Sequence, residues 1–108
     1  MNNIKYSPEA ENDLVELKDY ISSEYDNPDA ATRIVAMITK RIRDLQTFPK
    51  MGANLSSIIG IDTEYRYIVC EEYIAFYRFD ECNVYIIRIL HGQRDYLKIL
   101  FGNPLHDR

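Results

Sequence analysis

The sequence predicts an α+β domain in which two helices pack against a small antiparallel sheet. Two consecutive segments in the first half of the chain each carry an apolar stripe with helical spacing. Three runs rich in β-branched and aromatic residues follow, separated by links so short that they favour antiparallel hairpins. The expected order of elements is therefore β-α-α-β-β-β, with a short C-terminal segment after the sheet.

The first helix is predicted over residues 8–24, after a short strand over residues 3–7. Ser7 suits the helix cap and Pro8 suits the first helical position. The apolar stripe of this helix follows at spacings of four, three and four residues: Ala10, Leu14, Leu17 and Ile21. The rest of its surface is acidic, and we expect it to be solvated.

A second helix is predicted from Pro28, with Asn27 as its cap, to the pair Phe48-Pro49. Its apolar stripe consists of Ala31, Ile34, Ile38, Ile42 and Leu45. The two adjacent helices therefore form a helical hairpin. Residues 51–62 contain glycines and serines and are expected to form a loop.

The three strands are predicted over residues 64–70, 73–79 and 84–90. The last run is apolar on both faces, which indicates a central strand covered on each side, and its one polar member is Arg88. Residues 95–101 are expected to form a short helix or an edge strand. We expect a single domain over residues 1–102 and a flexible tail over residues 103–108.

The composition excludes several classes of protein. No run approaches the ~20 apolar residues of a membrane helix, and the chain opens without a signal-like segment, so we expect a cytoplasmic protein. The net charge of −4 argues against a broad basic surface for nucleic acid. Cys70 and Cys82 flank one predicted strand, too far apart for a disulfide. No metal-ligand spacing occurs, so we expect neither a metal nor a cofactor.

Four arginines form the first candidate site. Arg66, Arg78 and Arg88 lie on three consecutive predicted strands, and Arg94 follows the third. Because an arginine on an apolar strand is costly unless it is paired, a converging group would bind a phosphate or a carboxylate. The alternative is a set of structural ion pairs with nearby carboxylates: Glu64, Glu72, Asp80 and Asp95.

His91 is the second candidate, at the end of the last predicted strand. An imidazole there suits general acid or base chemistry in RNA cleavage, with Arg88 or Arg94 on the phosphate. The alternative, which we favour, is a histidine that hydrogen-bonds within the turn at Gly92. Asp95 is expected either to accept bonds from N–H groups of the turn or to pair with Arg94.

In this order and spacing, the motifs resemble the toxins of the RelE/ParE superfamily, which belong to bacterial type II toxin–antitoxin pairs. The similar segments are YSPEAENDLVELKDYI, LQTFPKMG with its Pro-x-x-Gly loop, YRYIVCEEYIAFYRF, and the closing VYIIRILHGQRDY. The resemblance implies the fold derived above. It also implies a growth-inhibiting protein that is neutralised by a cognate antitoxin.

The resemblance leaves the target open. RelE-like members cut mRNA on the ribosome, whereas ParE-like (plasmid stabilisation) members act on DNA gyrase without nuclease chemistry. The mRNA-cutting branch tends to carry an arginine where this chain has Ile74, so we favour the ParE-like branch and a protein that is not an enzyme. A toxin fold that has lost its toxicity, and a homodimer, stay open as alternatives. The residues that the resemblance marks as candidate contacts with the target or the antitoxin are Arg66, Arg78, Arg88, Arg94 and Tyr96.

Overall fold

The elements follow the predicted order along the chain. A computed structural model describes residues 2–102, and the tail predicted over residues 103–108 lies outside them. The elements are β1 (Asn3–Tyr6), α1 (Pro8–Glu24), α2 (Pro28–Arg43), η1 (Asp44–Gln46), β2 (Ala53–Asn54), α3 (Ser56–Ile59), β3 (Arg66–Cys70), β4 (Tyr73–Phe79), β5 (Asn83–His91) and α4 (Tyr96–Phe101). The C-terminal segment is thus a helix, not an edge strand.

The sheet is mixed, where a wholly antiparallel sheet was predicted. Its strand order is β1-β5-β4-β3-β2. The three neighbouring pairs from β2 to β5 are antiparallel, but β1 runs parallel to β5. Short links reveal direction only for consecutive strands, and 76 residues separate the end of β1 (Tyr6) from the start of β5 (Asn83). β5 has a strand on each side for part of its length, as its apolar pattern predicted.

Both long helices begin directly after the capping residues that the sequence predicted, Ser7 and Asn27. The Oγ atom of Ser7 accepts a hydrogen bond from the Ala10 N–H at 2.9 Å, and Oδ1 of Asn27 accepts one from the Ala30 N–H at 3.1 Å. These bonds satisfy N–H groups that have no partner within the helix. A proline follows each cap, and its fixed φ suits the first helical turn.

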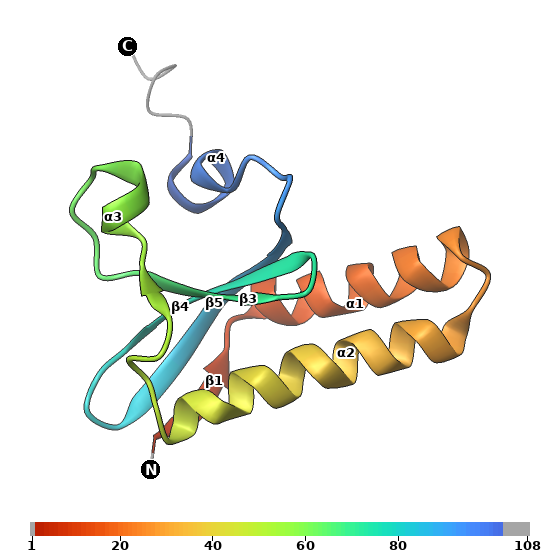
Figure 1. The fold of residues 1–108 in the computed structure, drawn as a ribbon, viewed down its shortest axis with the longest axis horizontal. Helices are drawn as coiled ribbons and strands as arrows, with labels where there is room; N and C mark the ends of the chain where they lie inside the picture. The colour runs from red at the N-terminus through yellow and green to blue at the C-terminus, as the bar shows by residue number, and fades with distance from the viewer. Residues whose placement is uncertain (1, 103–108) are drawn as a thin grey trace.

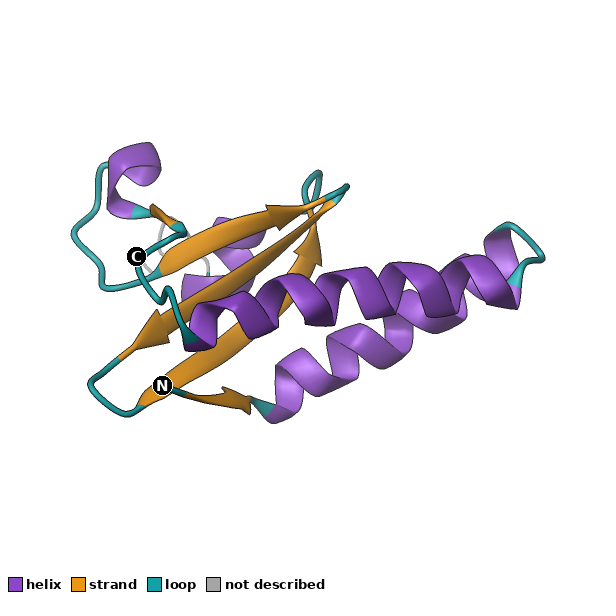
Figure 2. Ribbon diagram, turned by 60° about the horizontal axis from the view of Figure 1, so that its bottom comes forward, coloured by secondary structure: helices purple, strands orange, loops and turns teal. Residues whose placement is uncertain are grey.

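The two long helices lie on one face of the sheet and two short helices lie on the other. α1 and α2 cover one face, and the short α3 and α4 cover the other (Figure 1). The two long helices lie side by side and extend past the end of the strands (Figure 2). Their buried apolar side chains meet Ile68, Tyr77, Val84, Ile86 and Ile89 of the sheet. Each fully buried aliphatic side chain of this kind contributes about 1.5–3 kcal/mol, so this layer is the main core.

Neither cysteine forms a disulfide within residues 2–102, as predicted. Cys70 is buried at the end of β3, and Cys82 is exposed in the turn between β4 and β5. Burial raises the pKa of the Cys70 thiol, the larger effect, although Arg41 opposes it. Within the same residues, no helix has both the length and the apolar character needed to cross a membrane.

The segment predicted as a loop, residues 51–62, contains β2 and α3 and is held by a buried tyrosine. The hydroxyl of Tyr77 donates to the Pro49 carbonyl at 2.6 Å and accepts from the Gly52 N–H at 3.0 Å. A Cβ atom on Gly52 would lie 2.5 Å from this hydroxyl and 2.7 Å from the Tyr67 carbonyl oxygen. The Pro-x-x-Gly pattern is therefore a steric requirement of the contact with Tyr77.

Replacing Gly52 with alanine is expected to destabilise the fold by about 2 kcal/mol, because the new methyl group displaces the Tyr77 side chain. Chemical denaturation of purified protein measures the change. Gly92→Ala is the matched control, since a Cβ there meets nothing closer than 3.4 Å. Equal losses from both variants would contradict the steric role of Gly52.

Candidate functional site

Arg88 of β5 is paired with Asp13 of α1. Nε and Nη2 of Arg88 donate to the two carboxylate oxygens of Asp13, each at 2.8 Å. The Ile89 N–H donates to the same carboxylate at 2.9 Å. The bonds to Asp13 raise the pKa of Arg88. Asp13 is buried, so the prediction of a wholly solvated acidic face on the first helix is wrong at this residue.

The start of α1 completes the hydrogen bonding along one edge of β5. β1 pairs with β5 only up to Ile86, and a one-residue bulge follows at Ile87. Beyond β1, the Ser7 N–H donates to the Ile86 carbonyl at 3.0 Å, and the Ser7 hydroxyl donates to the Ile87 carbonyl at 2.8 Å. Asp13 then accepts from Ile89, so the backbone of Ser7 and the side chains of Ser7 and Asp13 replace a missing strand partner.

Three of the four candidate arginines have partners within the chain, which matches the alternative of structural pairing. Nη1 of Arg66 donates to the Gly52 carbonyl at 2.8 Å. Arg78 lies 3.8 Å from Glu64 and 4.3 Å from the centre of the Tyr85 ring. Since Arg66 is paired across the sheet with the residue that precedes Arg78, the two arginines lie on opposite faces. Structural pairing therefore explains Arg78 as predicted, whereas the partner of Arg88 comes from α1.

His91 takes part in the turn that ends β5. Its Nδ1 atom accepts a hydrogen bond from the Gln93 N–H at 3.2 Å, and Nε2 lies 3.9 Å from a carboxylate oxygen of Glu72. The ring packs edge-on against Tyr73, with 5.4 Å between centres. These contacts match the turn-forming alternative. Oδ1 of Asp95 accepts from the Lys98 N–H at 3.3 Å, so Asp95 caps α4.

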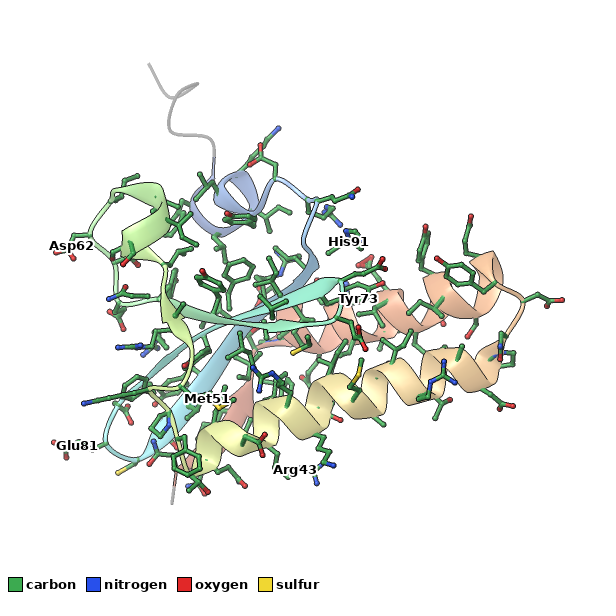
Figure 3. The ribbon with its side chains drawn as sticks, viewed as in Figure 1. Arg43, Met51, Asp62, Tyr73, Glu81 and His91 are labelled. Carbon is green, nitrogen blue, oxygen red and sulfur yellow. The ribbon has the colours of Figure 1, made fainter. Side chains whose placement is uncertain are left out.

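A groove of about 520 Å³ joins α1 to the end of β5 and the turn after it. His91 and Arg94 both line it, and Tyr73 lies beside His91 at this end of the sheet (Figure 3). Arg94 is exposed and forms no ion pair within residues 2–102. The groove thus brings together two predicted site residues, His91 and Arg94. Tyr96, the first residue of α4, instead packs against Phe76 of the sheet, with 5.3 Å between the ring centres.

Sequence reasoning missed two residues of the groove, Glu16 and Tyr20. Glu16, Tyr20 and Tyr73 line it together with Leu17. The spacing of Asp13, Glu16 and Tyr20 along α1 places them in one row, and this signal is readable from the sequence. No cluster of three metal-binding side chains occurs in the part of the chain that the structure describes.

The fold is similar to those of chains in two solved structures. It is similar to a chain from a chromosomal ParDE toxin–antitoxin system of P. aeruginosa, with a TM-score of 0.71 and 24% identity over 84% of this chain and 96% of that one. It is also similar to a chain of the E. coli DinJ–YafQ complex, with a TM-score of 0.51 and 15% identity over 94% of this chain and 100% of that one. No curated protein matches the chain.

The family model of the ParE toxin of type II toxin–antitoxin systems (parDE) matches residues 4–96. The chain belongs to this family. The match runs from the second residue of β1 to the first residue of α4, so it includes the helical hairpin, all of the sheet except Asn3, and the residues that line the groove.

Replacing Asp13 with alanine is expected to lower the free energy of unfolding by about 3 kcal/mol, because Arg88 and the Ile89 N–H lose their shared partner. Urea denaturation measures this loss. The control is Glu11→Ala, an exposed carboxylate on the far side of α1 that should cost under about 0.5 kcal/mol. Adding Arg88→Met to the alanine variant should restore part of the stability. If it restores none, the cost does not come from the unpaired guanidinium.

The turn between β4 and β5 should respond to acid through Asp80. Its Oδ1 atom accepts from the N–H groups of Cys82 and Asn83 at 2.9 and 2.8 Å, and these bonds lower the pKa of Asp80. A lowered pKa stabilises the fold above the unfolded value of about 3.9, and this contribution is lost as the pH falls through the folded value.

We therefore expect the stability advantage of the wild type over Asp80→Asn to be constant from about pH 5 to 7 and to shrink below about pH 4. Thermal unfolding across this range measures the advantage. An advantage that stays the same down to about pH 2 would show that the charge of Asp80 plays no part.

Proposed function

We propose that this protein is the toxin of a parDE-type pair, that it inhibits growth in the cytoplasm by acting on DNA gyrase, and that a cognate antitoxin neutralises it by direct binding. The observation that carries the proposal is the match of the ParE toxin family model to residues 4–96. The similar P. aeruginosa chain comes from a ParDE toxin–antitoxin system, which supports an antitoxin as the partner. Stabilisation of a plasmid is the corresponding cellular role.

The proposed action is contact with the target, not cleavage of RNA. Arg66, Arg78 and Arg88 are engaged by partners within the chain, so they are poorly placed to stabilise charge on a reacting phosphate. Ile74 lies in β4 at the position where the mRNA-cutting branch tends to have an arginine. Of the candidate contact residues, Arg94 has an exposed guanidinium, and exposed arginines are common anchors of protein interfaces.

A supercoiling assay with purified gyrase and relaxed plasmid tests this proposal. We expect the wild-type protein to inhibit supercoiling or to trap cleaved DNA, and Arg94→Ala to weaken the effect by roughly tenfold. The control is Arg43→Ala, which removes an exposed arginine at the end of α2, outside the groove. Unchanged supercoiling at high toxin excess would overturn the gyrase proposal.

A second candidate is a ribosome-dependent mRNA endonuclease, because His91 and Arg94 line the same groove. His91 would act as the acid or base, and Arg94 would contact the phosphate. Primer extension on translated mRNA separates the two functions. Cleavage that disappears in His91→Ala would favour the nuclease, and absence of cleavage would exclude it.

A third candidate is a toxin fold that only binds its partner. Expression of the chain without an antitoxin distinguishes it from both toxic functions. Normal growth in the presence of folded protein would favour the binding module.

A further inference from the structure

The groove beside α1 combines an apolar floor with charged groups at its rim. Leu17 and Ile89 are buried floor residues, and Tyr20 and Tyr73 add aromatic rings. Tyr20 is 56% exposed although it lies next to this floor, so the ring offers a large area to an incoming group. A concave site with an apolar base and a few polar groups is suited to receive side chains of a partner.

The charge of the groove is unbalanced at the α1 side. Glu9, Asp13, Glu16 and Tyr20 follow one another at spacings of four, three and four residues, so they lie along one side of the helix. Arg88 donates both of its hydrogen bonds to Asp13, so Glu16 forms no ion pair or side-chain hydrogen bond within residues 2–102, although its charge still acts on Arg88. α1 carries six carboxylates and one lysine, a net charge of −5, which attracts a basic segment.

We propose that this groove binds an arginine side chain of the antitoxin, with the guanidinium between the carboxylate of Glu16 and the ring of Tyr20. The planar guanidinium forms paired bonds to a carboxylate and stacks on an aromatic ring, which a lysine ammonium does less well. An apolar neighbour of the arginine covers Leu17 and Ile89. That the occupant belongs to the antitoxin rests on the proposed function.

Arg94 determines the direction of the bound segment. Its guanidinium repels a second cation, so a carboxylate of the same segment lies at that side of the groove while the arginine lies at Glu16. A segment bound in this way covers Arg94, the residue proposed to contact gyrase. Neutralisation then follows from occlusion of the contact surface.

Binding of short capped peptides to ¹⁵N-labelled protein, followed by NMR, tests the groove without any assay of toxicity. One peptide carries an arginine between two leucines, a second carries uncharged citrulline in place of the arginine, and a third carries glutamate there. We expect the arginine peptide to shift the amide signals of Glu16, Tyr20, Tyr73 and His91, and to bind roughly fivefold more tightly than the citrulline peptide.

Glu16→Gln and Tyr20→Ala should each remove most of this preference for arginine. The matched control is Glu11→Gln, which removes one negative charge from the opposite side of α1. An equal loss in the control would mean that the peptide senses only the overall charge of α1, and it would overturn the proposal. So would equal affinity for citrulline, or tighter binding of the glutamate peptide through Arg94.

The two proposals fail separately. If the protein leaves gyrase unaffected but binds the arginine peptide in this groove, the proposed binding site is supported and the proposed action on gyrase is contradicted. If the protein poisons gyrase but shows no preference for the arginine peptide, the proposed action on gyrase is supported and the proposed binding site is contradicted.

Discussion

The contact between Asp13 and β5 determines how the helical hairpin sits on the sheet. One carboxylate accepts two bonds from Arg88 and one from the Ile89 N–H, so it neutralises a charge and satisfies a strand edge at the same time. An arginine in the middle of an apolar strand would otherwise be costly to bury. Because α1 supplies the carboxylate, the helix must lie beside the second half of β5, and α2 follows through their shared apolar core.

The groove is a consequence of this arrangement. β1 ends its pairing at Ile86, and α1 takes over as the neighbour of β5 through Ser7 and Asp13. A helix cannot fill the space beside a strand as another strand does, so a hollow forms between the next turn of α1 and the end of β5. The row that contains Asp13 then continues into this hollow as Glu16 and Tyr20. The residue that fixes the helix thus also determines which side chains face the groove.

Much of the fold was predictable from the sequence because its signals are local. The caps at Ser7 and Asn27 and the apolar stripes identified both helices, and short links identified the antiparallel strands. The parallel pairing of β1 was not predictable in this way, since it joins residues far apart in the chain. The site was harder for the same reason. Asp13 looks like any other carboxylate of an acidic helix until its distance to Arg88 is known.

Pairing inside the chain occupies three of the four candidate arginines. Arg66, Arg78 and Arg88 bind groups of the protein itself, whereas Arg94 forms no ion pair within residues 2–102. A protein that acts by contact needs only a few exposed anchors on a rigid support, and Arg94 follows directly from the strand that Asp13 holds in place. Because the groove is already formed in the chain without a partner, binding of a partner segment needs little ordering of the groove itself. A partner segment that fills the groove also covers Arg94, which lines it.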